Sequence, residues 1–486
     1  MIIWELIGFL LLLLAILLTI QLGYTSFLVN YLIQLKEYRL DRLIAYLKTV
    51  SGKKQLLSIF NLFDFLKWKK FYRPKFTFRI LLTFIILAFC QYRFFFFSLI
   101  LFYKALYSWQ KNILLSIILS LSFIVWLTPL FCLMASLLIE VVLIPLKFTI
   151  TYFAYKKIKK MNNLLVIGIT GSYGKTTTKE MIAFLLDPYF KVLKTPLNCN
   201  TKIGIAMLVL RNLKFDHQIF IVEMGAYRKG EIADICQMVG PKVGIITGVN
   251  EQHFQLFGSL ENIINTKYEL IQSLPANSMS FFNIKDRKVF DLGKKTKKPK
   301  IYYGYKKIPI NISLTAFWHQ EAIQAAWTIG KYLKLSEKDM VKRLIKFKGL
   351  PTAIKIIKGI SGVKIIDDSY NSNPKGFVAA LQLLENTKAD KKILITNGIS
   401  ELGDKAEEIH QKIARKAALI CQRIILTKED HKQVFLKEIK KIDKSLKLEF
   451  EEDLVKIIDS LKLDLNKKTL ILIEGRVLKG LKEALL

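Results

Sequence analysis

A short glycine-rich run, residues 168–178 (GITGSYGKTTT), places the strongest constraint on how this chain folds. The apolar stretch 164–167 before it is typical of a buried parallel strand, and residues 179–186 after it read as a helix with its apolar side chains on one side. Strand, glycine turn and helix together form the context in which backbone N–H groups hold a phosphate. The run therefore predicts a nucleotide-binding α/β domain.

Individual residues of this run have separate expected roles. Gly171 and Gly174 let backbone N–H groups turn toward an anion, Lys175 adds positive charge at the β- and γ-phosphates, and Thr176 offers a hydroxyl group to Mg²⁺. The spacing differs from the general Walker A form, because Ile169 stands where that form has glycine. Glycines that serve only a tight turn are the alternative interpretation, and the strand, the lysine and the three threonines argue against it together.

Composition limits the classes of partner. The 486 residues leave room for about three domains of the usual size, and the net charge of +35 accompanies 52% hydrophobic residues. Such a charge suits nucleic acid or anionic lipid, but no basic helix with interleaved aromatics and no nucleic-acid signature is present, so we expect no nucleic-acid partner. The five cysteines form no C-x-x-C pair, which argues against a zinc site or a disulfide framework and fits a reducing cytoplasm.

The first residues of the chain predict a membrane anchor. Residues 2–22 are almost continuously apolar, which is long enough to span a bilayer, and neither a basic start nor a small-residue cleavage site suggests a signal peptide. Eleven lysines and arginines follow between residues 36 and 75. By the positive-inside rule this loop lies in the cytoplasm and the N-terminus outside.

A second apolar region, residues 76–150, is interrupted at Arg93, at 104–111 and at Pro129. The lysines of 156–160 mark the cytoplasmic side again, so the number of spans between the two basic regions is even. Four short spans give five in total and two long ones give three; we expect five, since Arg93 then lies near the outer face. A buried soluble helical domain is the alternative, but such helices carry a polar face and these runs do not.

Polar residues that suit a metal follow the later strands. Glu223 ends the apolar strand 216–224, and a carboxylate at the carboxyl end of a strand in an α/β sheet lies where ligands bind, so it is a candidate Mg²⁺ ligand. A solvated acid at a strand end is an equally good interpretation of Glu223 alone. His253 and Lys267 follow another apolar strand, 243–247, and each alone would be an ordinary surface residue.

Five segments in a fixed order carry a family resemblance. They are GITGSYGKTTTKE, NCNTKIG from Asn198, EMGAYRKGEI from Glu223, HFQLFGSLENIINTKYEL from His253 and IIDDSYNSNP from Ile365. Together they resemble the Mur ligases, above all the MurF type, which uses ATP to add D-alanyl-D-alanine to UDP-N-acetylmuramoyl-tripeptide. The resemblance extends from about residue 164 to the C-terminus and does not include the first 160 residues.

The resemblance implies a role for each matching residue. Lys175 would hold the phosphates, Thr176 and Glu223 one Mg²⁺, and His253 a second Mg²⁺ bridged by Lys267, which is carbamoylated in this family. A carbamate supplies anionic oxygens where an ammonium group repels Mg²⁺. The other residues implied in ATP binding are Gly171, Ser172, Gly174, Thr177 and Asp368, and those implied in the substrate cleft are Asn198, Asn200, Asn371 and Asn373.

The chain also departs from the family pattern. Ala353 stands where an arginine usually reaches the ATP phosphates, Ile323 and Gln324 stand where an asparagine for adenine is expected, and residues 474–476 (EGR) replace a KGSR-type sequence. A membrane segment takes the place of the small domain that grips the UDP part of the substrate. The muropeptide is therefore either soluble and UDP-linked or lipid-linked.

We expect three parts: transmembrane helices over 1–160, a central P-loop domain with a parallel sheet over 161–353, and a C-terminal Rossmann-like α/β domain over 354–486. The expected function is an ATP-dependent amide ligase, anchored by multiple spans in the bacterial inner membrane with its catalytic domains in the cytoplasm. With two Mg²⁺ ions it would join an amino acid or dipeptide to a muropeptide carboxylate through an acyl phosphate, in contact with membrane lipid.

Two other functions are possible. A degenerate nucleotide-binding scaffold for wall synthesis is favoured by Ala353 and by the missing UDP-binding domain, whereas the complete set of phosphate-loop and metal-site residues argues against it. A membrane ATPase is favoured only by the spans, which contain little charge beyond Glu140 and Arg93.

Overall fold

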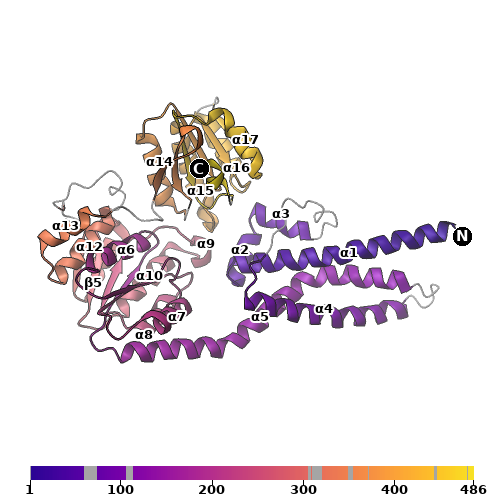
Figure 1. The fold of residues 1–486 in the computed structure, drawn as a ribbon, viewed down its shortest axis with the longest axis horizontal. Coiled ribbons are helices and arrows are strands. Elements are labelled where there is room, and N and C mark those ends of the chain that lie inside the picture. Colours follow the sequence, from indigo (N-terminus) through magenta and orange to yellow (C-terminus); the bar gives the residue numbers. More distant parts are fainter. Residues whose placement is uncertain are drawn as a thin grey trace. The chain divides into compact units, whose positions relative to one another are not determined.

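The computed structural model divides the chain into two compact units, Met1–Lys147 and Phe148–Leu486 (Figure 1). The residues that it describes are 2–59, 74–105, 113–304, 308, 320–347, 354–369, 372–442, 446–478 and 480–486.

Three long apolar helices dominate the first unit. They are α1 (Ile2–Leu35), α4 (Phe78–Ala105) and α5 (Ile113–Lys159), and each is long and apolar enough to cross a membrane. At 1.5 Å per residue, each exceeds the roughly 30 Å of a hydrocarbon core. The last residues of α5, from Phe148 on, belong to the second unit. Two short helices, α2 (Leu40–Leu47) and α3 (Val50–Ile59), lie in the basic stretch after α1.

The number of helices differs from the five-span expectation. Two helices, α4 and α5, occupy the described part of residues 76–150, where four short spans were expected. Arg93 lies inside α4, and Pro129 and Pro145 lie inside α5, so none of these residues ends a helix. An apolar helix keeps most of its backbone hydrogen bonds across a single proline, and ending it there would leave backbone groups unpaired. The helices therefore match the three-span alternative.

Polar side chains join these helices in their interior. Gln91 Nε2 of α4 donates hydrogen bonds to Ser26 Oγ of α1 at 3.3 Å and to Thr128 Oγ1 of α5 at 3.1 Å. Asn30 Nδ2 of α1 donates to Cys132 Sγ of α5 at 3.5 Å. Such contacts hold apolar helices together where the surroundings provide no hydrophobic drive for association.

A fully parallel sheet forms the centre of the second unit, as the alternating strand and helix pattern predicts. Its order is β2-β3-β1-β4-β5-β6. The strands are β1 (Leu165–Thr170), β2 (Val192–Lys194), β3 (Ile219–Glu223), β4 (Val243–Ile246), β5 (Met279–Asn283) and β6 (Lys300–Tyr303).

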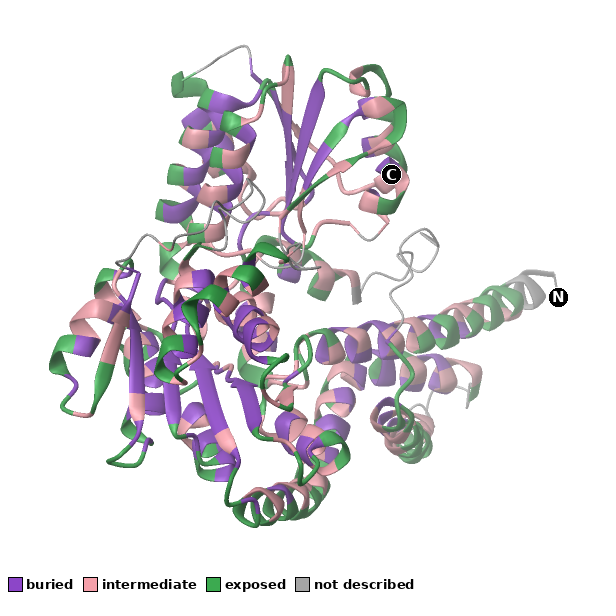
Figure 2. Cartoon of the chain, turned by 60° about the vertical axis from the view of Figure 1, so that its left-hand side comes forward, coloured by how far each residue is buried: buried purple, intermediate pink, exposed green. Residues whose placement is uncertain are grey.

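Helices cover both faces of this sheet, because alternate residues of each strand point to opposite sides. Phe220 packs with one core cluster and Ile221 with the other, and both are fully buried. Figure 2 shows that much of the strand backbone belongs to buried residues. On the face of Ile221 lie α6 (Lys175–Leu186), α12 (Gln320–Tyr332) and α13 (Glu337–Ile345). On the face of Phe220 lie α7 (Lys202–Asn212), α8 (Glu231–Val239), α9 (Phe254–Phe257), α10 (Leu260–Gln272) and α11 (Arg287–Lys295).

A second sheet, of order β11-β10-β9-β12-β8-β7, forms the C-terminal part. It is parallel except for the antiparallel pair β7 and β8, which confirms the expected Rossmann-like α/β architecture. Its strands are β7 (Lys355–Lys358), β8 (Lys364–Asp368), β9 (Lys391–Thr396), β10 (Arg423–Leu426), β11 (Lys447–Phe450) and β12 (Thr469–Glu474). Its helices are α14 (Pro374–Asn386), α15 (Ala406–Ile420), α16 (Lys432–Ile442), α17 (Leu454–Leu461) and α18 (Leu481–Leu485).

Candidate active site

The predicted phosphate loop lies at the carboxyl end of the central sheet. Strand β1 has β3 on one side and β4 on the other, with Ile169 opposite Glu223 and Thr170 opposite Ile246. Residues that directly follow these three neighbouring strands therefore converge. In open α/β sheets this is where ligands bind.

Glycine is required in the loop for two reasons. Gly171 has a φ of +150°, and a Cβ added there would lie 2.1 Å from Thr247 Oγ1. Gly174, at the start of α6, has a φ of +76°, which other residues rarely adopt. The backbone N–H of Ser172 donates to the Gly248 carbonyl at 2.7 Å, so the loop is held against the segment that follows β4.

Lys175 folds back over the loop. Its Nζ donates to the carbonyl oxygens of Gly171 at 2.7 Å and Ser172 at 3.4 Å. Burial lowers the pKa of Lys175 from its ordinary value, and the carboxylate of Glu223 partly offsets that effect. A partly desolvated ammonium group beside backbone N–H groups suits an incoming phosphate.

Three side chains converge on the carboxylate of Glu223, which is only 4% exposed. Thr176 Oγ1 donates to Oε2 at 2.9 Å, Lys179 Nζ donates to the same oxygen at 3.2 Å, and Asn200 Nδ2 lies 3.4 Å from Oε1. A hydroxyl and a carboxylate oxygen side by side are ligands that Mg²⁺ prefers, so these residues fit one such ion. Lys179 was not identified from the sequence as a partner of Glu223. The available signal was that Lys179 lies among the apolar, inward-facing positions of α6.

The Lys179→Met variant is expected to destabilise the protein, because it leaves the buried Glu223 without its cation. Lys179 is fully buried, and removing one partner of a buried pair costs about 3 kcal/mol or more. The matched control is Lys331→Met, whose exposed pair with Glu337 is worth less than about 1 kcal/mol. Urea unfolding of both variants measures the difference. Equal free energies of unfolding would contradict a stabilising role for Lys179.

His253 lies just after β4 with a φ of +59°. Its Nδ1 is 2.5 Å from Glu401 Oε2, and its ring packs edge-on against Tyr227. Glu401, which follows β9 in the C-terminal part, was not singled out by its sequence. A carboxylate on one ring nitrogen is the usual way to orient a metal-binding histidine. Among the described residues, no three His, Cys, Asp or Glu side chains come together as a metal site.

Lys267 lies on α10 with its side chain buried, only 4% exposed. Burial lowers the pKa of Lys267 to about 7, and the positive charge of Lys175 contributes to the shift. Its Nζ lies 5.5 Å from the ring centre of Phe257. A large fraction of this lysine is therefore a neutral amine near pH 7, unlike an ordinary surface lysine.

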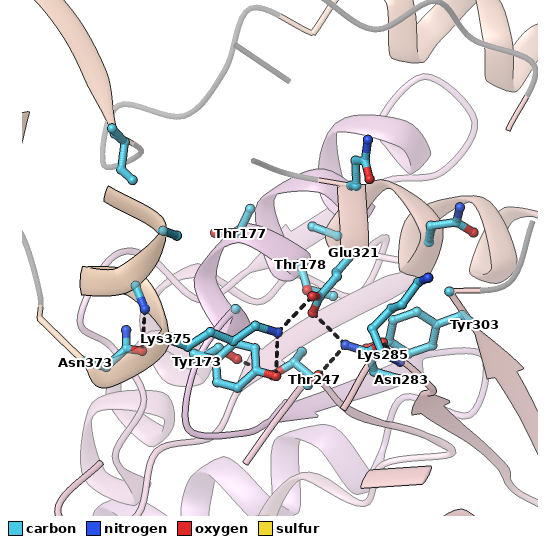
Figure 3. Close-up of a pocket in the computed structure, with 18 of the residues that line it drawn as sticks. Tyr173, Thr177, Thr178, Thr247, Asn283, Lys285, Tyr303, Glu321, Asn373 and Lys375 are labelled. Atoms are coloured by element: carbon cyan, nitrogen blue, oxygen red, sulfur yellow. Dashed lines mark hydrogen bonds and ion pairs between the residues drawn. The ribbon is translucent and has the colours of Figure 1, made fainter. Parts of the chain in front are cut away.

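A pocket of about 460 Å³ lies beside the loop and is lined from both the central and the C-terminal parts (Figure 3). Lys375 Nζ donates at 2.9 Å both to the Tyr173 hydroxyl and to Glu321 Oε1. Asn283 Nδ2 in turn donates to Glu321 Oε2 at 2.7 Å. Lys375, on the first turn of α14, thus brings a cation from the C-terminal part to the phosphate loop. No local pattern had marked it.

Several of the predicted ATP and substrate residues line this pocket. Gly174, Thr177, Asp368 and Asn373 do so. Burial, with a smaller effect from the neighbouring Asp367, raises the pKa of Asp368 to about 6.

The predicted asparagines separate in space. Asn373 caps α14, and its Oδ1 accepts from Asn250 Nδ2 at 3.0 Å. Asn200 lies instead beside Glu223, and Asn198 has a φ of +63° in the loop before α7. Asn371 and Ala353 lie outside the described residues.

Ile323 and Gln324, which stand where the family has an asparagine for adenine, face different surroundings. Gln324 lines the pocket, whereas Ile323 is buried in the core under α12.

Comparisons with known proteins match this part of the chain. Residues 169–342 match the family profile of the Mur ligase middle domain, and residues 354–477 that of the Mur ligase, glutamate ligase domain. The UDP-N-acetylmuramoyl-tripeptide–D-alanyl-D-alanine ligase of Bacillus subtilis is 31% identical over 270 residues, which are 51% of this chain and 59% of that protein. The protein of the same name from Synechocystis is 28% identical over 275 residues, 52% of this chain and 59% of that protein. The chain thus spans about three fifths of the length of these curated relatives.

Solved structures share the fold. MurF from Acinetobacter baumannii superposes with a TM-score of 0.60 at 23% identity, over 70% of this chain and 79% of that one. MurF ligase from Thermotoga maritima in complex with ADP gives 0.58 at 23% identity, over 70% and 84%.

Proposed function

Because the chain belongs to the Mur ligase family through its middle and C-terminal domains, we propose that it is an ATP-dependent carbon–nitrogen ligase of peptidoglycan precursor synthesis. The central domain is taken as residues 161–353 and the C-terminal domain as 354–486. In this proposal the bond formed is an amide between a muropeptide carboxylate and the amine of an amino acid or dipeptide such as D-alanyl-D-alanine, the pair named for the curated relatives.

One observation carries the proposal: a single pocket receives the phosphate loop from one domain and Asp368 and Lys375 from the other. A site that needs both domains excludes water when they close. Exclusion of water matters for a ligase, since water would hydrolyse an activated acyl group before the amine arrives.

The residues divide the work of two steps. In the first, a substrate carboxylate oxygen attacks the γ-phosphorus, the bond to the β–γ bridging oxygen breaks, and ADP leaves. Backbone N–H groups of the loop, with Lys175, offset the charge that develops on the phosphoryl oxygens. In the second, the neutral amine attacks the acyl carbon, phosphate leaves, and the nitrogen loses a proton.

Mg²⁺ would be held by Thr176 and Glu223, and when bound it supplies positive charge that offsets the charge of the phosphoryl oxygens. A second ion belongs to the proposal through His253 and a carbamoylated Lys267. The low pKa of Lys267 supports that modification, since the neutral amine is the form that reacts with CO₂.

Lys375 is our candidate for the phosphate contact that the family's arginine, expected at Ala353, would make. Its ammonium group donates a hydrogen bond to the hydroxyl of Tyr173, which is a residue of the phosphate loop. Lys375 itself belongs to the C-terminal domain. We assign it a phosphate contact at domain closure. The three apolar helices support anchoring in the bacterial inner membrane with these domains in the cytoplasm.

Phosphate release by the purified full-length protein tests the function. We expect release only when ATP, a muropeptide and an amine are all present, measured against a panel of UDP-linked and lipid-linked muropeptides. ATP binding without turnover on any substrate would favour the scaffold alternative. Release that needs no muropeptide would favour a membrane ATPase.

A further inference from the structure

A largely buried arginine, Arg79, lies at the start of α4, close to the end of α1. Arg79 is in the first turn of α4, and the backbone just before it is tied to α1, because Gln34 Nε2 donates to the Lys75 carbonyl at 2.9 Å and Gln34 Oε1 accepts from the Lys75 N–H at 2.6 Å. The guanidinium group of Arg79 stacks on the ring of Tyr38, 3.6 Å from its centre. Its side chain is only 19% exposed.

Only part of this guanidinium group is paired. Arg79 Nη1 contacts Glu140 Oε2 of α5 at 2.9 Å. The Nε and Nη2 atoms are buried and have no hydrogen-bond acceptor among the described residues, and the same is true of the Tyr38 hydroxyl. A buried donor without an acceptor is costly, more so when it is charged. These three donors therefore call for an acceptor that the described residues do not supply.

The same chain shows what this edge of an arginine binds. At Arg423, Nε and Nη2 hold both oxygens of Glu449 at 3.1 and 2.6 Å, while Nη1 contacts Asp464 at 2.7 Å. Arg79 has the Nη1 contact of this arrangement without a protein anion on the other edge. The Nε and Nη2 pair is a planar fork that matches two oxygens of a carboxylate or a phosphate.

Charge around Arg79 also favours an anion. Glu140 pairs with Lys147 as well as with Arg79, so one carboxylate faces two cations and a net positive charge remains. The described stretch after α1, which includes α2 and α3, adds further lysines and arginines at positions 36, 39, 42, 48, 53 and 54, and only two acids, Glu37 and Asp41. Positive charge beside a membrane attracts anionic lipid.

The surroundings favour a lipid over a soluble anion. The candidate spans end at Leu35 and begin at Phe78, so Tyr38 and Arg79 lie at the level where lipid phosphates lie in a bilayer. Large apolar side chains next to them are exposed: Phe76 is 68% exposed, and Phe78 81%. Acyl chains would cover these side chains, whereas a soluble phosphate would leave them in water.

We propose that Nε and Nη2 of Arg79, with the hydroxyl group of Tyr38, bind the phosphate group of an anionic membrane lipid. The site lies wholly within the first unit and is independent of the proposed ligase activity. Glu140 orients the guanidinium group through Nη1, and its fork has no protein acceptor among the described residues, so the lipid phosphate would supply one. The Tyr38 ring stacks on one face of the guanidinium group and so fixes its orientation.

Native mass spectrometry of the full-length protein in detergent tests the site. The probes are phosphatidic acid, which is a phosphomonoester, and phosphatidylcholine, whose phosphate is neutralised within its headgroup. We expect phosphatidic acid to bind more tightly and the Arg79→Gln variant to weaken it about tenfold. The matched control is Lys53→Gln, which removes one positive charge from an exposed position of the same basic region and should change binding by less than about twofold.

Two further, more conservative variants distinguish a lost lipid contact from a misfolded protein. Arg79→Lys keeps the charge beside Glu140 but loses the fork, and Tyr38→Phe keeps the stacked ring but loses the hydroxyl; both should weaken phosphatidic acid several-fold while circular dichroism stays unchanged. Equal losses in Arg79→Gln and Lys53→Gln, or equal binding of both lipids, would overturn the proposal. Full competition by inorganic phosphate would overturn its lipid part.

Discussion

The Lys175→Ala variant is expected to lose ATP-dependent turnover by about a thousandfold or more, while the protein still folds and enters the membrane. Lys175 Nζ lies over the phosphate loop on the Gly171 carbonyl, and its pKa is lowered by burial. A desolvated cation at this point is worth several kcal/mol to a transferring phosphoryl group. Its loss removes charge where charge develops and leaves the packing of α6 unchanged.

Single-turnover phosphate release measures this loss, and binding of a fluorescent ATP analogue shows whether the nucleotide still enters. The control is Lys191→Ala, which removes an equally charged side chain from an exposed surface pair with Asp216. It should leave the rate within about twofold of the unmodified protein. A Lys175→Ala protein with near-normal turnover would refute the ligase function, because no other cation of the loop could replace it.

The phosphate loop was predictable because its information is local. Gly171 and Gly174 are needed for their own backbone conformations, and Lys175 and Thr176 follow at fixed positions of one helix. The partners from the C-terminal domain were not predictable in this way. Glu401 and Lys375 reach His253 and Tyr173 only through the packing of two domains, and no spacing in the sequence encodes such a contact.

The apolar helices of the first unit show a different limit. Hydropathy predicted apolar helices, since the total apolar length is visible in the sequence. It did not predict where each helix ends, because an interior arginine such as Arg93 and a proline such as Pro129 interrupt the composition without interrupting the helix. The hydropathy pattern alone is therefore compatible with three or with five spans, and the helix boundaries in the structure match three.

The Lys267→Ala variant is the second large expected effect. It should lose about a hundredfold or more in turnover, since the proposed carbamate supplies anionic oxygens to a metal. Acetate should restore part of the activity by placing a carboxylate in the vacated volume. Lys267→Arg should not respond to acetate, because the guanidinium group fills the space and keeps its positive charge. Full activity of Lys267→Ala would exclude the carbamate.

A direct signal for the carbamate separates this explanation from a purely structural role. In protein equilibrated with ¹³C-labelled CO₂, a carbamate carbon resonance should appear and should be absent from Lys267→Ala. Its pH dependence follows from the pKa of Lys267, which burial lowers to about 7. Only the neutral amine reacts with CO₂, so the signal should be strong above pH 7 and fall as the pH is lowered through 7, where the ammonium form takes over. Ordinary lysines titrate near 10.4 and would give a signal that rises only at far higher pH. A resonance that follows that later titration, or that persists in Lys267→Ala, would place the carbamate elsewhere on the protein.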